Sequence, residues 1–386
     1  MTNQRQIGFS IAIMNIVVVV VLFLLSITNL AIAWSLGIMY GFTIQRSRFC
    51  TVASIRDVFL IRNFSIAKGI LLYLIITTVT FGVLYFISGK TSLMVGSRLE
   101  PVSIFTMIGA FIFGIGMVIA GGCTSGTLIR MGEGLIMQWW SFLGIVLGLL
   151  LTTWQYDRIS QYNIGRDAIF LPDLIGLPQS IVLQVCLFAG VYGLFTRIEQ
   201  RKHGSAVSAA RFQAASVPLP FAQRFFRPWS YTTGAVFLAI LTTLVFLWNK
   251  TWGITNGIIH LTFGLLKTAV PAVNESPLLV QMAAKQDAFL AHPFVPLVLA
   301  MIIGSLISAL LGKEFRIRHV ANRRFIASAL AGGFFMGVGA RLAHGCNISS
   351  VMSGIPSLSL HGWVFLLCMI LGVWVGLKIL MRYLVK

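Results

Sequence analysis

The sequence predicts an all-α membrane protein that crosses the bilayer many times. Of its 386 residues, 57% are hydrophobic and only 10% are charged, and the mean hydropathy is +0.90. Soluble domains carry about 25% charged residues. Apolar runs long enough to cross a bilayer recur along the whole chain. Because lipid cannot satisfy backbone polar groups, such runs are expected to form α-helices.

Ten apolar segments have about the 20-residue length that a bilayer-crossing helix needs. They cover approximately residues 9–26, 28–45, 64–87, 104–120, 136–154, 179–197, 229–249, 294–312, 325–342 and 361–383. The first segment has no small-residue cleavage site after it, and the second follows closely. We therefore expect it to be a retained helix rather than a signal peptide.

Four shorter stretches lie between these segments, at 51–62, 124–133, 256–267 and 347–356. They are too short to cross a bilayer, and irregular backbone at membrane depth is tolerated only inside the protein or along a cavity. We therefore expect about ten long helices together with short re-entrant half-helices or surface segments.

Positive charge orients these spans. Lysine and arginine number 29 against 10 acidic residues, which gives a formal net charge of +19. No aromatic-plus-basic signature for nucleic acid accompanies this excess, so it indicates cytoplasmic loops rather than RNA or DNA binding. The basic regions 197–227, 313–324 and the C-terminal tail are predicted to be cytoplasmic. The connections 155–178 and 250–293 contain both acidic and basic residues and are predicted to face outside. With ten spans, both termini are then predicted to be cytoplasmic.

Two glycine-rich stretches, 108–123 and 331–346, align as an internal repeat. Each residue of the second lies 223 positions after its counterpart, and Trp140 and Trp363 match at the same offset. Seven pairs in the stretch are identical: Gly109/Gly332, Phe111/Phe334, Gly114/Gly337, Gly116/Gly339, Ala120/Ala343, Gly122/Gly345 and Cys123/Cys346. The predicted topology runs the first copy inward and the second outward, so the repeats are inverted, as in many transporters.

We therefore predict one transmembrane transporter domain over residues 1–386. Its first repeat covers about 28–154, a cytoplasmic loop covers 197–227, and its second repeat covers about 229–383. Close helix packing alone can explain glycines at this spacing. Packing does not explain the Gly-Cys pair that follows each glycine-rich helix.

The five cysteines are odd in number and scattered, which does not predict a disulfide framework, so we expect free thiols. Cys186 and Cys368 lie within spans without glycine neighbours, and we expect them to be small buried hydrophobic side chains. Cys50, Cys123 and Cys346 instead lie at the junction between a long segment and a short one. Each is followed by polar residues that could open a short helix.

The surroundings of these three cysteines suit an anion that has a soft, polarizable atom at one end. Free amides at a helix start favour anions, and glycine beside the thiol lets the backbone approach a ligand closely. A thiol is a weak, polarizable donor, and weak sequential contacts suit transport because each site must also release its ligand. The predicted substrate pathway comprises Gln45, Arg48, Cys50, Gly121, Gly122, Cys123, Thr124, Arg341, His344, Gly345, Cys346 and Asn347.

Several of these residues have ordinary alternative explanations. Arg341 could help to hold an anion, because a charge within a span is a functional hypothesis by default. A structural ion pair or a snorkelling side chain explains it equally well. His344 could tune binding with pH, or it could simply pack or form a hydrogen bond. Arg130 and Glu133 are interpreted as an i,i+3 ion pair.

Other chemistries fit the three cysteines less well. Without nearby histidine or carboxylate partners they make a poor zinc site, and we predict no metal or other cofactor. A Cu(I)-thiolate pathway and a thiol redox relay remain as alternatives, although the sequence contains no CxxC. An enzyme would need a thiolate poised near a base, and we predict a transporter instead.

Four groups of motifs follow one another along the chain. They are "GFTIQRSRFC" with "RD" at 56–57, "GIGMVIAGGCTSGT" with "GEG" at 132–134, "EFRIR" at 314–318 and "GVGARLAHGCN" at 337–347. With these motifs the chain resembles the YeeE/YedE family of sulfur-compound transporters. The resemblance covers roughly residues 36–380, and some features, such as "SLHGW" at 359–363, are similar to the YedE-type branch.

This resemblance implies import of thiosulfate across the inner membrane. It also implies an hourglass-shaped bundle in which loop cysteines, here Cys50, Cys123 and Cys346, hold the substrate at the waist by weak thiol hydrogen bonds. A small TusA-like cytosolic sulfur carrier protein is the implied partner. Another sulfur oxyanion or a selenium compound is the alternative substrate.

Overall fold

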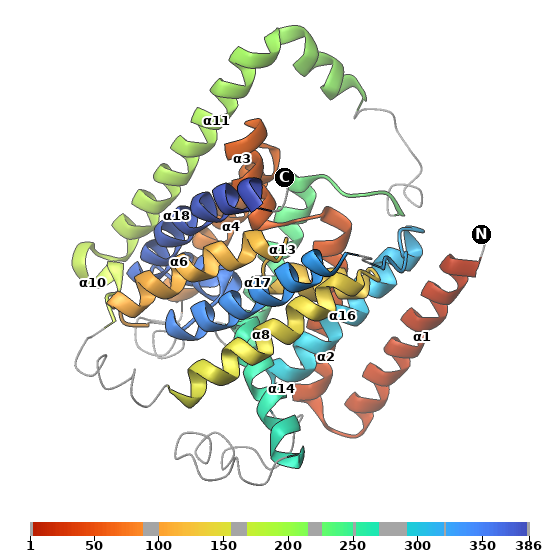
Figure 1. Cartoon of the computed structure of the whole chain (residues 1–386). Helices are drawn as coiled ribbons and strands as arrows, with labels where there is room; N and C mark the ends of the chain where they lie inside the picture. Colours follow the sequence, from red (N-terminus) through yellow and green to blue (C-terminus); the bar gives the residue numbers. More distant parts are fainter. Residues whose placement is uncertain are drawn as a thin grey trace.

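The computed structural model describes residues 3–87, 100–155, 168–214, 226–249, 252–269, 292–319 and 322–383. The elements of these ranges are helices, and the β-pairing they contain is limited to two isolated bridges. Figure 1 shows the long helices gathered into one bundle with short helices between them. The all-α prediction is therefore confirmed.

A long helix coincides with each of the ten predicted apolar segments. They are α1 (Asn3–Leu24), α2 (Thr28–Ser47), α4 (Ser65–Ile87), α6 (Ile104–Ile119), α8 (Ile136–Trp154), α11 (Leu177–Ala214), α13 (Tyr231–Asn249), α16 (Phe294–Leu311), α17 (Arg323–Leu342) and α18 (Leu360–Tyr383). In the described part of the chain, nine helical stretches are long and apolar enough to cross a membrane. The tenth long helix, α2, ends on the polar residues Gln45, Arg46 and Ser47. The chain is therefore a polytopic membrane protein.

Short helices also form where the sequence predicts them. They are α3 (Thr51–Ile61), α7 (Thr124–Gly132), α14 (Ile254–Ala269) and η2 (Asn347–Gly354), with a further short helix, α10, at Leu171–Ile175. The η2 segment is wound as a π-helix. Such windings are rare and frequently accompany functional sites.

The predicted cytoplasmic loop 197–227 differs from the structure. Residues 197–214 continue α11 as one uninterrupted helix, and residues 215–225 lie outside the described residues. The segment is rich in Arg, Gln and Ala, which favour helix, and its first helix-breaking proline is Pro218. Half or about half of each predicted external connection, at 156–167 and 270–291, also lies outside the described residues.

Helices α6 and α17 cross in close contact at the centre of the bundle. A Cβ atom on Gly116 would lie 2.7 Å from the carbonyl oxygen of Gly332, and one on Gly109 would lie 2.7 Å from that of Gly339. Gly332 and Gly339 are the repeat counterparts of Gly109 and Gly116, so each glycine contacts the counterpart of the other. Such reciprocal contact is what a two-fold axis between two copies produces.

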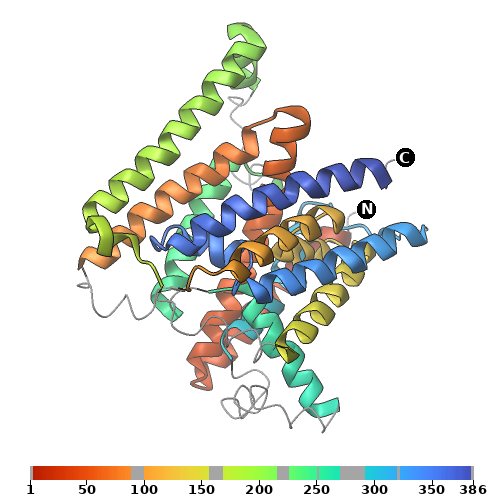
Figure 2. The same ribbon diagram turned by 60° about the vertical axis from the view of Figure 1, so that its left-hand side comes forward.

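The neighbouring helices repeat this reciprocity. Gly114 of α6 packs against the backbone of α18 at Met369, and its counterpart Gly337 packs against the backbone of α8 at Ile145. Outside the repeats, α1 packs on α16 and α2, whereas α11 packs on α4. Figure 1 shows α1 and α11 on opposite flanks of the bundle, and Figure 2 shows α11 still lying along its outer edge. We propose from these reciprocal contacts that residues 28–154 and 229–383 are inverted repeats.

Candidate functional site

The two glycine-rich helices end in the same turn. Gly121 after α6 has φ +74°, and its counterpart His344 after α17 has φ +55°. The next amide closes each turn: Gly122 N–H donates to Met117 O at 3.0 Å, and Gly345 N–H donates to Ala340 O at 2.9 Å. This is the Schellman ending, in which a left-handed residue stops the helix. Glycine adopts that conformation freely, whereas His344 adopts it at an energetic cost.

Each of the three junction cysteines occupies the N-cap of a short helix. Cys50 precedes α3, Cys123 precedes α7 and Cys346 precedes η2. The sulfur of Cys123 accepts the Gly126 N–H at 3.4 Å and lies 3.1 Å from the Ser125 hydroxyl oxygen. The prediction that each of these cysteines opens a short helix is therefore confirmed.

The three helix starts meet in the interior. The thiols of Cys50 and Cys123 form a hydrogen bond with each other. Beside them, the Asn347 side-chain amide donates to the Thr51 hydroxyl oxygen at 2.7 Å, which joins the start of η2 to the start of α3. Three partially positive helix ends therefore face one small region, an arrangement that favours an anion.

This region is buried yet contains unsatisfied polar atoms. Cys123 is 2% exposed and Cys346 is 1% exposed. Among the described residues, Thr124 Oγ1, Asn347 Oδ1 and Ser350 Oγ are buried without a hydrogen-bond partner. Buried polar atoms normally have partners, so the region around the cysteines is suited to a small polar ligand.

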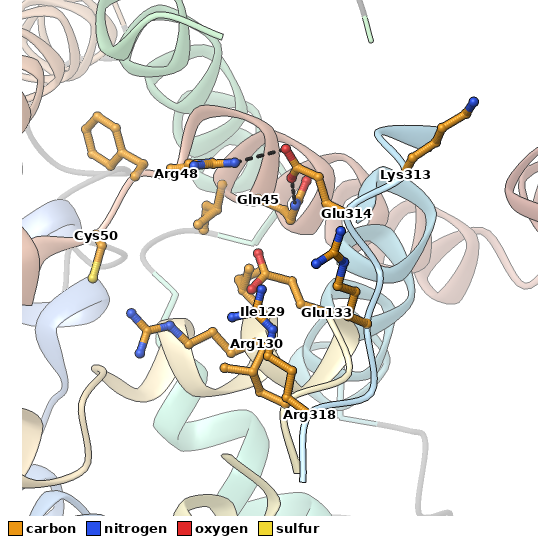
Figure 3. A pocket seen from close by; sticks show the side chains of 14 residues that line it. Gln45, Arg48, Cys50, Ile129, Arg130, Glu133, Lys313, Glu314 and Arg318 are labelled. Atoms are coloured by element: carbon orange, nitrogen blue, oxygen red, sulfur yellow. Dashed lines mark hydrogen bonds and ion pairs between the residues drawn. The ribbon is translucent and has the colours of Figure 1, made fainter. Parts of the chain in front are cut away.

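A pocket of about 530 Å³ opens beside Cys50, and we call it the inner pocket because its 313–318 wall belongs to a predicted cytoplasmic connection. The end of α2, helix α7 and residues 313–318 form its walls, as Figure 3 shows. Its charged lining residues are Arg48, Arg130, Glu133, Lys313, Glu314, Arg316 and Arg318. Five cations against two carboxylates make the pocket attractive to anions.

Gln45 and Arg48, both predicted pathway residues, are bound to Glu314 in this pocket. The Gln45 amide, only 2% exposed, donates to Glu314 at 2.9 Å and accepts the Ser308 hydroxyl at 2.6 Å. Arg48 forms an ion pair with the other Glu314 oxygen at 2.9 Å. Sequence reasoning missed Glu314 as a site residue, although it belongs to the "EFRIR" stretch that carries the family resemblance.

The predicted ion pair between Arg130 and Glu133 is wrong. The Arg130 guanidinium donates instead to the carbonyl oxygen of Gly121, and the ion pairs of the described residues do not join it to Glu133. The Schellman turn leaves this carbonyl accessible to Arg130. The spacing of the two residues in the sequence does not reveal this contact. Glu133 turns toward Gln45, and burial raises the pKa of its carboxyl group.

The pair of thiols changes the acidity of Cys50. Its pKa falls to about 6, chiefly because the Cys123 thiol donates a hydrogen bond to the thiolate, while burial opposes the change and Arg130 assists it. Cys50 lines the inner pocket and is therefore reachable from it.

Arg341 and His344 lie in a second pocket of about 220 Å³, which we call the outer pocket because Glu100, on its wall, precedes the predicted external end of α6. Thr255, Asn256 and Gly345 also line it, and the two pockets have no lining residue in common. Neither pocket includes Cys123 or Cys346 in its lining. The structure thus brings nine of the predicted residues to the cysteine turns and the inner pocket. Arg341, His344 and Gly345 line the outer pocket, and the last two also belong to the turn before Cys346.

The prediction that the other two cysteines are buried is wrong. Cys186 is exposed on α11, and Cys368 is only partly buried on α18. Helix α11 packs on α4 and α10, and Cys186 lies on an exposed part of its surface. A small apolar side chain is tolerated on such a face when lipid surrounds it.

Comparison with known proteins gives a consistent result. A family model described as "Sulphur transport" matches residues 46–375. The chain is 28% identical to the thiosulfate transporter TsuA of Escherichia coli over 343 residues, which is 88% of this chain and 91% of that protein. It is 26% identical to TsuA of Spirochaeta thermophila over 90% of this chain and 97% of that protein.

A shorter similarity connects the chain to a second group. Over 82 residues it is 40% identical to the probable transporter YedE of Salmonella typhimurium, covering 21% of this chain and 20% of that protein. The family model, in contrast, extends from the end of α2 into α18 and includes all three junction cysteines. The chain belongs to the Sulphur transport family of membrane proteins.

Proposed function

We propose that this protein imports thiosulfate, or a closely related sulfur-containing anion, across the inner membrane. The observation that carries the proposal is the meeting of three cysteine-capped helix starts in a buried region that contains unsatisfied polar atoms. The relatives named thiosulfate transporters, which match along nearly the whole chain, support this substrate.

In this proposal the anion enters at the outer pocket and leaves at the inner one. Arg341 and His344 attract it at the outer pocket, and it then passes Cys346, Cys123 and Cys50 in turn. Gly121, Gly122 and Gly345 keep side chains away from the turns, so backbone amides and thiols can reach the substrate. The terminal sulfur of thiosulfate is soft, and thiols offer weak donors that release it readily.

The buried polar atoms have a part in this passage. Thr124, directly after Cys123, has a hydroxyl that lacks a partner among the described residues and can donate to a passing oxyanion. Asn347, directly after Cys346, uses its amide nitrogen on Thr51 and holds the two starts together. We propose that the inner pocket, with its excess of cations, then delivers the anion to a small TusA-like sulfur carrier protein in the cytosol.

The test is uptake of radiolabelled thiosulfate by cells that lack their own importers. We expect Cys123→Ala and Cys346→Ala each to lower uptake at least tenfold. The matched control is Cys186→Ala, which removes an exposed thiol outside both pockets and is expected to leave uptake unchanged. Sulfate and selenite serve as competitors that report the substrate class.

Two results would count against the proposal. Absence of thiosulfate uptake by the wild type would remove the substrate assignment, and strong competition by selenite would favour the selenium alternative. Equal uptake by all three variants would remove the cysteines from the pathway.

A further inference from the structure

The proposed import needs an energy source, and this inference depends on that function. Thiosulfate carries two negative charges, and moving each against 100 mV of inside-negative potential costs about 2.3 kcal/mol. The sequence contains no P-loop motif for nucleotide phosphates. A cation that travels with the anion would offset this cost, so we looked for a cation-binding group beside the anion pathway.

Two carboxylates lie near one buried amide in the inner pocket. The Gln45 side-chain nitrogen donates to Glu314 at 2.9 Å, and Glu133 lines the same pocket. Figure 3 shows both carboxylates turned toward Gln45. The Gln45 oxygen is occupied by the Ser308 hydroxyl, so this amide cannot rotate to present its acceptor to a carboxylic acid. One carboxylate therefore lies close to another in a partly enclosed pocket.

The surroundings of Glu133 decide how this pair titrates. Arg48 and Cys50 follow the end of α2 and line the pocket with Glu133. Arg130 lines it from α7, the helix that Glu133 ends. The 313–318 segment contributes the carboxylate Glu314 and the cations Lys313, Arg316 and Arg318. The nearest cations already have partners, because Arg48 binds Glu314 and Arg130 binds the Gly121 carbonyl. Glu133 thus has a like charge nearby and no direct ion pair among the described residues.

We propose that Glu133, paired with Glu314 across Gln45, is the proton-binding site of a proton-coupled anion transporter. An anion that reaches Cys50 attracts Arg48 and Arg130, and this weakens the stabilisation that these cations give to the carboxylates. A proton that comes from the outside with the anion then binds a carboxylate oxygen of Glu133, and both are released to the cytosol. No other bond forms or breaks. Burial and the Glu314 charge both raise the pKa of Glu133, which is the direction that this step requires.

Coupling follows from reciprocity. If the bound anion increases the proton affinity of Glu133, the bound proton must increase the affinity for the anion by the same factor. The hydroxyls of Thr124 and Thr127, which lack partners among the described residues, lie on α7 between Cys123 and Glu133 and offer a polar connection between the two sites.

The experiment uses purified full-length protein in liposomes, with the membrane potential clamped at zero by potassium and valinomycin. Labelled thiosulfate accumulation is measured with and without a pH gradient of one unit, acidic outside. One proton per anion predicts about tenfold higher accumulation in the wild type, since tenfold corresponds to about 1.4 kcal/mol. We expect Glu133→Gln to abolish this ratio. The control Glu199→Gln changes a carboxylate bound to Lys68, away from both pockets, and should retain it.

The outcomes separate this inference from the proposed function. If wild-type liposomes take up thiosulfate but ignore the pH gradient, proton coupling is wrong and transport stands. If they take up no thiosulfate, the proposed function itself fails. Accumulation by Glu133→Gln that still follows the gradient would overturn the role of Glu133 and direct attention to Cys50.

Should this variant carry no thiosulfate, proton release and uptake are followed with a pH dye as thiosulfate binds to detergent-solubilised protein. Proton uptake equal to that of the wild type would then overturn the assignment.

Discussion

At the scale of single residues, position in a turn decides the role of a side chain. Gly121 and His344 occupy the same left-handed position in two equivalent turns, although their side chains differ completely. The first lies beside the Arg130 guanidinium, and the second adds an imidazole to the outer pocket. A strained non-glycine residue of this kind is more frequent at functional sites than elsewhere.

Cys50 provides a prediction at the same scale. Because its pKa is lowered to about 6, its thiolate should be fully formed at pH 7.5, whereas an ordinary thiol with a pKa near 8.5 is mostly protonated there. We expect the rate of alkylation of Cys50 by iodoacetamide to rise with pH and to reach half its maximum near pH 6. Mass spectrometry of the modified peptide measures this rate from pH 5 to pH 9.

The control for this prediction removes the hydrogen bond. Cys123→Ala takes away the donor that stabilises the thiolate, so the half-maximal pH should move upward by at least one unit. A half-maximal pH above 8 in the wild type would contradict the thiol pairing.

At the scale of helices, glycine positions determine how closely the two central helices approach. A Cβ atom on Gly332 of α17 would lie 2.8 Å from the Gly116 carbonyl oxygen and would also collide with the backbone nitrogen of Ala120. Backbone cannot move aside as a flexible side chain can, so an added side chain forces the helices apart. The cysteine turns directly follow these helices and would move with them.

This geometry predicts that Gly332→Val destabilises the protein by about 1–3 kcal/mol, the usual cost of overpacking. The matched control is Gly190→Val on α11, where an added Cβ would meet nothing within 4 Å. Thermal unfolding in detergent, followed by circular dichroism, compares the two. Equal melting temperatures for both variants would show that α6 and α17 are not in close contact.

At the scale of the whole molecule, the distribution of charge and the reciprocal contacts describe one architecture. The basic segment 313–318 forms a wall of the inner pocket, and the corresponding outer pocket is smaller and contains Glu100. If the two repeats are inverted, these pockets open to opposite sides of the membrane. The turns that contain Cys123 and Cys346 would then meet near the middle of the bilayer.

Topology mapping tests this arrangement. In a background in which Cys50, Cys186 and Cys368 are replaced by serine, we expect Arg324→Cys to react with a membrane-impermeant maleimide only in inside-out vesicles, and Leu174→Cys to react only in intact cells. Both positions are well exposed in the structure. Labelling of both from the same side would exclude inverted repeats and the assignment of inner and outer pockets.

Sequence patterns alone predicted the fold class, the ten long helices, the short helices between them and the position of Cys50, Cys123 and Cys346 directly before short helices. These features depend on composition and on neighbours within a few residues, which hydropathy, glycine and capping preferences describe directly. The continuation of α11 through residues 197–214 was missed because charge was taken to indicate a loop, although the same residues favour helix.

Which of these local features meet depends on the tertiary structure. Gln45 and Glu314 are 269 positions apart in the chain, and Asn347 and Thr51 are 296 positions apart. It also replaced the expected partner of Arg130 with the Gly121 carbonyl, and it placed Cys186 on an exposed face. Contacts of this kind depend on how helices cross and on which faces they leave uncovered, and no local pattern in a single sequence contains that information.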